Sequence, residues 1–546
     1  MSDTQTLSVD AVVIGAGFGG IYMLHKLRNG LGLKVRAYDK AGGVGGTWYW
    51  NKYPGALSDT EAHIYQYSFD KEMLQDWDWK NRYWNQADIL AYLQAVVERH
   101  DLGKDIQLNT NIESLVFNDA SHSWTVMTGD GETVTARYVV CALGLLSKIN
   151  LPDIKGRDSF RGTMVHTGDW PADLTLEGKR VGVIGTGSTG TQFICAASKL
   201  AGHLTVFQRS AQYSVPSGNG PVKKEYVKKI KANYDQIWEQ VRSSFVGFGF
   251  QESDVPAMSV SEEERERVFQ EAWEKGNGFR FMFGTFSDVA IDPAANRAAR
   301  LFIRRKIADI VKDPETARKL TPTDPYAKRP ICNLDYYETF NRDNVTLVST
   351  KENPIIEITP RGVLTDDGVE YELDVLVFAT GFDAVDGNYH QMDIRGRGGR
   401  TIQQHWKDGP TTYLGVATTG FPNMFMVLGA NSCFANIPPV IETQVEFISD
   451  LISRAQRTGA AVEPTEEAES YWTATCKQIA DATLFAKTES WIFGANIPGK
   501  PHTVLFYMGG LAPYRQMLAD VARADCAGFF QHPALIMRFQ RAGSVG

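Results

Sequence analysis

The sequence predicts an α/β fold made of two Rossmann-like dinucleotide-binding domains, the second of which carries a helical insertion. Three observations support this fold class. An apolar run leads into the pattern G-x-G-x-x-G at 15–20. The same arrangement returns at 185–190, and a helix-compatible stretch follows each motif. The length of 546 residues also requires several domains, at roughly 100–200 residues each.

Composition and charge narrow the range of partners. A hydrophobic share of 43% with 22% charged residues is typical of a globular protein and excludes a disordered, collagen-like or coiled-coil chain. The net charge of −8 is opposite to the basic excess of a nucleic-acid binder. No run of about 20 apolar residues is present to span a membrane. We therefore expect a small-molecule substrate, and neither nucleic acid nor membrane as a partner.

The six cysteines are dispersed, without a C-x-x-C pair or the Cys/His spacing of a zinc site. We expect reduced thiols, as in cytoplasmic proteins, and no metal. Residues 1–6 lack the basic start of a signal peptide, and the apolar run after them is too short for one. The expected protein is cytoplasmic and monomeric.

The first nucleotide motif comprises Gly15, Gly17, Gly19 and Gly20, which follow an apolar strand at 11–14. The glycines allow a tight turn, and the N-terminus of the next helix favours a pyrophosphate. A second strand ends in Asp39, 24 residues after Gly15. Because a carboxylate at this place accepts hydrogen bonds from an unmodified ribose, the first site is predicted to hold FAD or NAD.

The second motif has the same form but a different strand ending. Its predicted cofactor-binding residues follow the strand at 181–184 and are Gly185, Gly187, Ser188, Thr189 and Gly190. The next strand ends in Arg209, again 24 residues after the first glycine. A guanidinium there suits a 2′-phosphate, so this site is predicted to hold NADP. A glycine-rich turn could explain either motif alone, but not a pair with opposite strand endings.

Two further strands, at 138–141 and 375–378, each run into Ala-x-Gly, which suggests domain boundaries near 145 and 385. Between about 221 and 313, charged residues alternate with apolar residues at helical spacing, which predicts the helical insertion. The expected layout is 1–145 for the first part of the FAD domain, 146–220 and 330–385 for the NADP domain, 221–329 for the insertion, and 386–546 for a C-terminal part that completes the FAD domain and the substrate cavity.

Two longer motifs are more specific than the glycine patterns. Residues 46–59 match G-x-W-x-x-x-x-Y-P-G-x-x-x-D. A second segment matches F-x-G-x-x-x-H-x-x-x-W-P through Phe160, Gly162, His166, Trp170 and Pro171. With both nucleotide motifs in the same order and spacing, the chain resembles the type I Baeyer–Villiger flavin monooxygenases from end to end. Within them it looks most similar to the cyclohexanone monooxygenases.

The resemblance implies an NADPH- and O2-dependent monooxygenase with FAD and NADP as cofactors. It implies insertion of one oxygen atom into ketones through a C4a-peroxyflavin, giving esters or lactones, and oxidation of thioethers to sulfoxides. Arg329 matches the active-site arginine of the family, and Asp59 matches the carboxylate that pairs with it. Lys328 matches the lysine that, with Arg209, holds the 2′-phosphate. Without the resemblance, a loop Asp and a Lys-Arg pair would be read as solvated surface groups.

Further cofactor contacts are carried over by the same resemblance. They comprise Gly46, Thr47, Trp48, Asp59, Tyr65, Ile112, Gln192, Ser210, Arg329, Ile437 and Trp491. Trp491 lies in a segment, 489–499, that resembles the family's mobile active-site loop, although a core tryptophan is the plainer explanation. His166 is assigned no acid–base role, because a structural imidazole bonded to the backbone is the common explanation for a lone histidine in such a place.

The predicted substrate pocket consists of Leu145, Phe248, Phe434, Ala435, Ile437 and Trp491, with Phe245 and Gly247 nearby. Segment 429–440 departs from the run G-P-N-G-P-F-T-N-L-P-P-S of close relatives by losing a Gly and two prolines and by changing side-chain bulk. We therefore expect a reshaped pocket that takes a bulky ketone or an aryl thioether.

Three other functions remain as alternatives. A related flavin monooxygenase could act mainly on bulky sulfides or amines, although the Trp48 and His166 signatures argue against it. A disulfide reductase would need a redox cysteine pair after the first nucleotide unit, which the sequence lacks. A nucleotide sensor would bind FAD without consuming O2.

Overall fold

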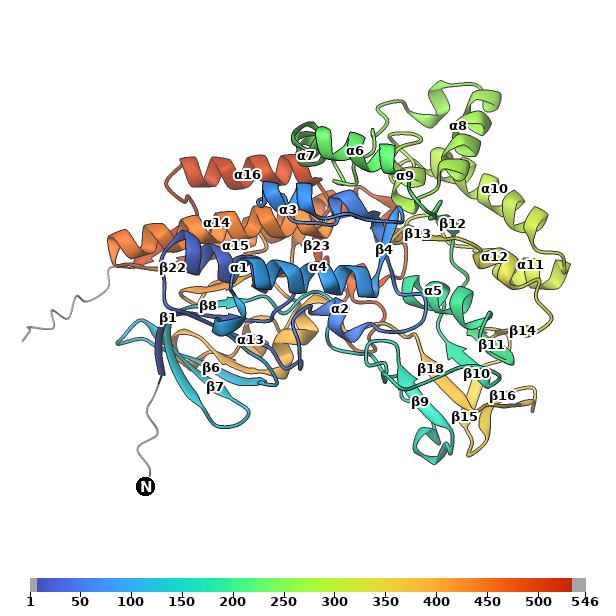
Figure 1. The fold of residues 1–546 in the computed structure, drawn as a ribbon, viewed down its shortest axis with the longest axis horizontal. Helices are drawn as coiled ribbons and strands as arrows, with labels where there is room; N and C mark the ends of the chain where they lie inside the picture. The colour runs from blue at the N-terminus through green and yellow to red at the C-terminus, as the bar shows by residue number, and fades with distance from the viewer. Residues whose placement is uncertain (1–6, 533–546) are drawn as a thin grey trace, which may run out of the picture.

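The computed structural model describes residues 7–532, so the N-terminal segment 1–6, expected above not to be a signal peptide, lies outside the described residues. The chain forms two α/β units and a group of helices that extends beyond them (Figure 1). The predicted fold class is confirmed. Within residues 7–532 no helix is both long enough and apolar enough to cross a membrane.

The first glycine motif joins β1 (Leu7–Ile14) to α1 (Phe18–His25). β1 pairs in parallel with β2 (Val35–Tyr38) on one side and β8 (Thr133–Cys141) on the other, so all three strands end at one edge of the sheet. That edge is where open α/β sheets bind ligands. The remaining strands of this sheet are β5 (Ile106–Gln107), β6 (Ile112–Asn118), β7 (Ser123–Thr128), β19 (Asp393–Arg395) and β20 (Met424–Met426).

Alternate residues of β1 face two different cores. Val13 packs in a cluster with α1 and α14 (Ile437–Thr458), whereas Val12 packs in a second cluster with Trp124 of β7. Burial of both faces is typical of a parallel strand between two layers and explains the continuous apolar run that the sequence shows there. β19 and β20 come from the C-terminal part of the chain and extend this N-terminal sheet.

The second glycine motif joins β10 (Arg180–Ile184) to α5 (Ser188–Ala197) in a separate sheet. This sheet has the order β14-β11-β10-β18-β9 and is parallel throughout. Its other strands are β9 (Thr163–His166), β11 (His203–Gln208), β14 (Val345–Ser349) and β18 (Val375–Phe378). A small antiparallel sheet lies beside it, formed by β15 (Ile355–Ile358), β16 (Gly362–Thr365) and β17 (Glu370–Glu372).

The predicted helical insertion is a group of helices that starts and ends at a two-stranded ribbon, in which β12 (Ser214–Pro216) pairs with β13 (Ile331–Asn333). Figure 1 shows α8 and α10 at the far end of the molecule and α6 and α7 near α16. The helices are α6 (Lys224–Ala232), α7 (Tyr234–Ser243), α8 (Glu262–Lys275), α9 (Gly278–Phe283), α10 (Pro293–Ile310) and α11 (Pro314–Leu320). The domain boundaries themselves stay predictions.

The long helix α14 shows how local sequence sets an element. It begins after Asn436 with two prolines, whose missing N–H groups are not needed in a first helical turn, and it ends at Gly459 with φ 72°. The other elements named below are α2 (Thr47–Trp50), β3 (Leu57–Glu61), α3 (Lys71–Asp76), β4 (Tyr83–Asn85), α4 (Gln86–Arg99), α12 (Tyr336–Thr339), α13 (Ile402–His405), β21 (Ser432–Cys433), β22 (Ala461–Pro464), α15 (Glu466–Asp481), β23 (Phe506–Tyr507), α16 (Leu511–Arg523) and β24 (Phe529–His532).

Candidate active site

One cavity of about 1780 Å³ is lined by both glycine motifs and by residues of the insertion and the C-terminal part. Typical single-ligand pockets hold about 300–1,000 Å³. The cavity therefore has room for two large ligands that meet inside it.

The two nucleotide turns have the same geometry. Gly15 has φ 108° and Gly185 has φ 111°, values that favour glycine. A Cβ on Gly15 would lie 2.3 Å from the carbonyl oxygen of Ala142, and one on Gly185 would lie 2.4 Å from that of Ala379. The Ala-x-Gly strand endings seen in the sequence therefore close these two turns.

Gly20 and Gly190, which were predicted to bind cofactor, do not line the cavity. A Cβ on Gly20 would lie 1.8 Å from the carbonyl oxygen of Gly15, and one on Gly190 would lie 2.3 Å from that of Gly185. These glycines let each helix approach its strand closely, and Gly15, Gly17, Gly19, Gly185 and Gly187 face the cavity.

The N-termini of α1 and α5 open into the cavity. Their N-cap residues, Gly17 and Gly187, provide no side-chain cap, and neither helix has an acidic residue in its first turn. A Cβ on Gly187 would meet nothing within 4 Å, so there is open space beside this helix end. Uncapped amides beside open space attract anions, and the residues present therefore fit two pyrophosphates.

The strand endings differ as the sequence indicated. The Asp39 carboxylate is buried beside the first turn and accepts hydrogen bonds from the amides of Ala16 at 2.6 Å and Ala41 at 2.8 Å. Burial raises its pKa in spite of these bonds. At the second motif Arg209 and Ser210 line the cavity, and Thr186 donates to the Ser210 carbonyl at 3.0 Å.

Lys328 lines the same cavity as Arg209, and its Nζ lies 2.8 Å from Asp324 Oδ2. Cations in the cavity, one of them at this strand end, suit a 2′-phosphate, whereas a lone carboxylate at the other strand end suits a ribose diol. The donor sets therefore fit NADP at the second motif and FAD at the first.

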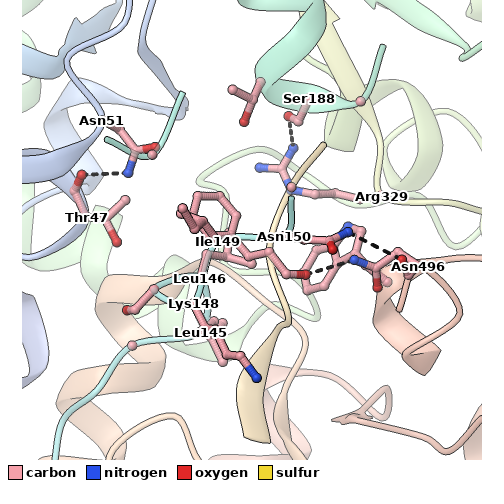
Figure 2. A pocket seen from close by; sticks show the side chains of 18 of the residues that line it. Thr47, Asn51, Leu145, Leu146, Lys148, Ile149, Asn150, Ser188, Arg329 and Asn496 are labelled. Carbon is pink, nitrogen blue, oxygen red and sulfur yellow. Dashed lines mark hydrogen bonds between the residues drawn. The ribbon is translucent and has the colours of Figure 1, made fainter. Parts of the chain in front are cut away.

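Arg329 and Asp59 form an ion pair at the centre of the cavity, with Nη1 of Arg329 2.6 Å from Oδ2 of Asp59. Figure 2 shows Arg329 reaching towards Ser188, to whose Oγ it donates a hydrogen bond at 2.8 Å. Burial would lower the pKa of Arg329, but the Asp59 charge outweighs burial and holds the pKa above its ordinary value. The arginine therefore stays charged.

Several hydrogen bonds hold Asp59 and its neighbours in place. Gln192 of α5 donates to the Leu57 carbonyl at 3.0 Å and to Asp59 Oδ1 at 3.4 Å, and it accepts from the Tyr53 hydroxyl at 2.8 Å. The Asp59 carbonyl accepts from Asn277 Nδ2 at 2.8 Å. The carboxylate is thus held by both nucleotide units and by the insertion.

The first long motif shapes the cavity next to α1. Gly46 approaches Gly17 so closely that a Cβ on it would lie 2.8 Å from the Gly17 Cα. Trp48 donates from its ring nitrogen to the Tyr65 hydroxyl at 3.2 Å. Both side chains line the cavity, as do Thr47 and Ile112.

An aromatic wall borders the Arg329 guanidinium. Phe248 and Phe279 stack with ring centroids 4.0 Å apart, and Phe434 lies 6.3 Å from Phe279. The Arg329 guanidinium carbon lies 5.7 Å from the Phe279 ring centre. All six predicted pocket residues line the cavity: Leu145, Phe248, Phe434, Ala435, Ile437 and Trp491.

Sequence reasoning missed Phe279. Phe279 follows Gly278 in an aromatic-rich stretch, but a local pattern does not tell which of those rings faces the cavity. Phe245 and Gly247, which were expected near the cavity, do not line it, and Phe245 is 39% exposed. Phe245 instead packs over Gly510 at the start of α16.

The residues that define the second long motif lie outside the cavity lining. His166 is in β9, its Nδ1 accepts from the Gly168 amide at 3.0 Å, and burial lowers its pKa to about 4. Trp170 packs against Phe193 of α5 with ring centroids 5.6 Å apart. None of Phe160, Gly162, His166, Trp170 and Pro171 lines the cavity, whereas Gly168 and Asp169 between them do.

The segment that carries Trp491 closes one side of the cavity. Trp491 meets Phe506 edge to face at 5.6 Å. Figure 2 shows Asn496 facing Asn150, whose amide lies 3.5 Å from the Asn496 carbonyl, and Asn496 donates to the Phe382 carbonyl at 2.8 Å. The Trp491 segment is thereby attached to both connections between the nucleotide units.

The six cysteines are buried free thiols, as expected for a reduced protein. Among residues 7–532 no group of three or more His, Cys, Asp or Glu side chains is placed to hold a metal ion.

Comparison with known proteins agrees with this geometry. Residues 9–265 match the family model described as pyridine nucleotide-disulphide oxidoreductase. A phenazine N-monooxygenase of Lysobacter antibioticus is 66% identical, over 97% of this chain and 98% of its own. A Baeyer–Villiger monooxygenase of Pseudooceanicola batsensis is 56% identical, over 95% and 96% of the two chains.

A cyclohexanone 1,2-monooxygenase of an Acinetobacter species is also 56% identical, over 96% of this chain and 97% of its own. Among solved structures, a closed cyclohexanone monooxygenase superposes with a TM-score of 0.96 at 59% identity, covering 97% of this chain and all of the other. A cyclohexanone monooxygenase from Rhodococcus sp. Phi1 bound to NADP+ gives the same TM-score at 60% identity, with 97% and 100% coverage.

Proposed function

The chain belongs to the FAD-containing, NADPH-dependent Baeyer–Villiger monooxygenases, and from this premise we propose that it inserts one oxygen atom of O2 into a ketone to give an ester or a lactone. The expected family and the two cofactors are confirmed. The observation that carries the proposal is the Arg329–Asp59 ion pair, with Asp59 buried and Arg329 half-buried, which lies in one cavity with both glycine motifs.

When bound, NADPH reduces FAD, and the reduced flavin activates O2 for transfer of one oxygen atom. The side chains provide the electrostatic surroundings for that transfer. Arg329 would stabilise the negative charge that develops on the carbonyl oxygen of the ketone as it is attacked. Asp59 keeps the guanidinium charged and oriented, and Ser188 fixes its other side. Asp59 is buried, whereas 29% of the Arg329 side chain is exposed where it lines the cavity.

Arg209 and Lys328 would select NADPH over NADH through its 2′-phosphate, and the amides of α5 would hold its pyrophosphate. The corresponding amides of α1, with Asp39, would hold FAD. Trp491 would contact NADP, because it lines the cavity that the second motif also lines.

The substrate is proposed to be larger than cyclohexanone. Phe248, Phe279 and Phe434 form a wall that suits a flat or bulky molecule, and Ala435 and Ile437 border the same space. A bulky ketone and an aryl thioether both fit this chemistry, since sulfur is oxidised with the same cofactors.

A second candidate is N-oxygenation of a flat aromatic heterocycle. It is favoured by the 66% identity to a phenazine N-monooxygenase and by the same aromatic wall, against which a fused ring system could stack. This matches the amine alternative considered from the sequence.

A substrate panel separates these functions. Purified protein with NADPH and O2 should be given cyclohexanone, a bulky ketone, an aryl methyl sulfide and phenazine, with products identified by mass. We expect an ester from the bulky ketone. A strong preference for cyclohexanone would refute the reshaped pocket, and an N-oxide without any ester would make the second candidate the function.

A further inference from the structure

Two ion pairs lie close together between β3 and residues outside it. Asp59 and Glu61 are two positions apart on β3, which pairs with β4 at Leu57 and Glu61 and is irregular between them. Asp59 binds Arg329 at 2.6 Å, and Glu61 binds Arg280 of α9 at 3.1 Å. The first pair lines the cavity, whereas Glu61 does not.

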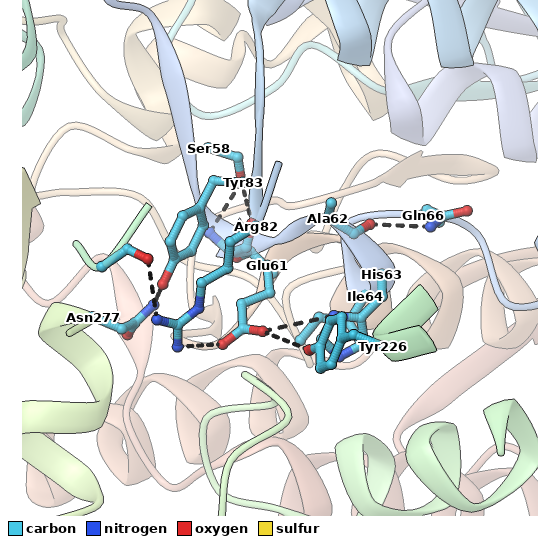
Figure 3. Close-up of polar contacts among 12 residues, drawn as sticks. Ser58, Glu61, Ala62, His63, Ile64, Gln66, Arg82, Tyr83, Tyr226 and Asn277 are labelled. Atoms are coloured by element: carbon cyan, nitrogen blue, oxygen red, sulfur yellow. Dashed lines mark hydrogen bonds and ion pairs between the residues drawn. The ribbon is translucent and has the colours of Figure 1, made fainter. Parts of the chain in front are cut away.

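Glu61 is the centre of a larger polar cluster, which Figure 3 shows with Arg82, His63 and Tyr226 around the carboxylate. Arg82 donates to it at 2.8 Å, Tyr226 at 3.4 Å, and His63 Nδ1 lies 3.7 Å away. Burial opposes ionisation of Glu61, but His63 and the two arginines outweigh burial and lower its pKa. Glu61 is therefore ionised although it is largely buried.

The cluster ties the insertion to the nucleotide unit. Arg280 and Tyr226 belong to the helices α9 and α6 of the insertion, whereas Glu61 belongs to β3. Arg82, just before β4, also donates to the Lys275 carbonyl of α8 at 2.6 Å. Charged groups thus set the position of α9 relative to β3, because in most other arrangements some of them would lose their partners.

The same helix carries an active-site side chain. Phe279, the neighbour of Arg280 on α9, lies 5.7 Å from the Arg329 guanidinium and stacks on Phe248. Arg329 therefore has one partner on β3, Asp59, and one on α9, Phe279. The Glu61–Arg280 pair joins these two elements directly.

Asn277 strengthens this junction. It caps α9 by accepting from the Arg280 amide at 3.1 Å, while its Nδ2 donates to the Asp59 carbonyl at 2.8 Å and to Tyr83 at 3.1 Å. Its φ of 85° is rare for a residue other than glycine. A strained backbone of this kind persists where the surroundings hold it, and such residues cluster at functional sites.

We infer that Glu61 is a positioning residue for oxygen transfer: its ion pair with Arg280 holds α9 against β3 and so fixes Arg329 between Asp59 and Phe279. The inference rests on the role proposed for Arg329. A shift of about 1 Å in a positioned group can lower a rate about 100-fold, so loosening this junction should act on oxygen transfer. The glycine motifs predicted to hold FAD and NADPH lead into other elements, α1 and α5, so the reaction of NADPH with FAD should be spared.

The test is Glu61→Gln, which keeps the shape of the side chain and removes its charge. We expect the oxygenated product formed per NADPH consumed to fall about tenfold, while the rate of flavin reduction by NADPH changes by less than about twofold. Hydrogen exchange of the β3 and α9 backbone amides, followed by mass spectrometry, should be faster in the variant. Adding Arg280→Gln to Glu61→Gln should cause little further loss, since both remove the same pair.

Glu442→Gln is the matched control, because Glu442 is also a buried carboxylate that links to the insertion. It accepts from the Ser68 amide at 2.5 Å, and Ser68 in turn accepts from Arg242 of α7 at 2.5 Å. This variant should change the melting temperature but leave product per NADPH unchanged.

Two results would overturn the inference: product per NADPH in Glu61→Gln within about twofold of wild type, or an equal fall in Glu442→Gln. Arg329→Ala, measured in parallel, separates this from the proposed function. If Arg329→Ala still makes product at the wild-type rate, the role of Arg329 is wrong, whatever Glu61 does. If Glu61→Gln does not fold, Arg280→Lys carries the same expectation, since it keeps the charge and loses the guanidinium geometry.

Discussion

Arg329 combines three properties that are seldom found in one side chain. It keeps its charge although burial opposes this, it is fixed by Asp59 and Ser188, and it lies against an aromatic ring. A charge held in place before the reaction needs no reorganisation when the oxyanion forms, which is why preorganised groups contribute strongly to rates.

Arg329→Ala should therefore lower the rate of ester formation by about 100- to 1,000-fold, because loss of one preorganised oxyanion donor has that effect in other enzymes. Flavin reduction by NADPH should continue. Stopped-flow absorbance without O2, combined with product analysis in air, measures both steps. Arg329→Lys should be intermediate, and ester formation at the wild-type rate in Arg329→Ala would contradict the assignment.

Arg209→Gln should raise the KM for NADPH about tenfold or more while leaving the KM for NADH nearly unchanged, because a charge-assisted hydrogen bond to phosphate contributes about 1.5–3 kcal/mol. Lys328→Gln should act in the same direction. Steady-state kinetics with each nucleotide measures the effect. An equal rise for both nucleotides would exclude contact with the 2′-phosphate.

Glu442 links stability to pH. Burial, more than its neighbour Glu446, raises its pKa to about 7, although bonds from Ser68 and the Arg242 charge oppose the shift. The pKa of Glu442 in the folded protein lies above its value of 4.5 in the unfolded chain, so the protonated carboxyl contributes to the stability of the fold. This contribution is complete below pH 4.5 and is lost as the pH rises through 7. Its size is about 3 kcal/mol.

Relative to Glu442→Gln, the wild-type protein should accordingly lose stability between pH 5 and pH 8. Melting temperatures of the two proteins across this range give the difference directly. A difference that does not vary with pH would show that Glu442 does not titrate there.

At the level of elements, the two nucleotide turns were predictable because each is local in sequence. The glycines, the apolar strand and the charged strand ending lie within residues 11–39 in the first unit and 181–209 in the second, and the structure repeats the turn with φ values 3° apart. The Ala-x-Gly endings were recognised as strand exits, but their contact with Gly15 and Gly185 depends on strand order, which the sequence does not state.

The junction between β3 and α9 could not be predicted. Glu61 and Arg280 are 219 residues apart, and each looks like a solvated charge in its own segment. Phe279 and Phe245 have similar local surroundings, and only the packing of α9 against the cavity distinguishes them. Sequence patterns found the helical character of the insertion but not the side that it turns to the substrate.

The matching turns permit a paired experiment on the two cofactors. Gly15→Ala places a Cβ against the Ala142 carbonyl and should remove FAD binding. Gly185→Ala places a Cβ against the Ala379 carbonyl and should remove NADPH binding while FAD stays bound. Flavin absorbance after purification and a titration with NADP+ measure the two effects. Loss of flavin from Gly185→Ala with normal NADP+ binding would contradict the assignment of the sites.

At the scale of the whole molecule, function follows from two sheets, one mixed and one parallel, whose glycine motifs line one cavity. The first sheet is extended by β19 and β20 from the C-terminal part, and the second is interrupted by the insertion that supplies Phe248, Phe279 and Arg280. The family motifs predicted this architecture. The shape of the pocket, which decides between ketone, sulfide and aromatic amine, depends on side chains from three distant parts of the chain.

The most direct test of the account follows isotopic oxygen into product. Purified, FAD-containing protein with NADPH, a bulky ketone and 18O2 should yield an ester or lactone that carries one heavy oxygen atom for each NADPH oxidised. Oxidation of NADPH that yields no labelled ester from any ketone would contradict it.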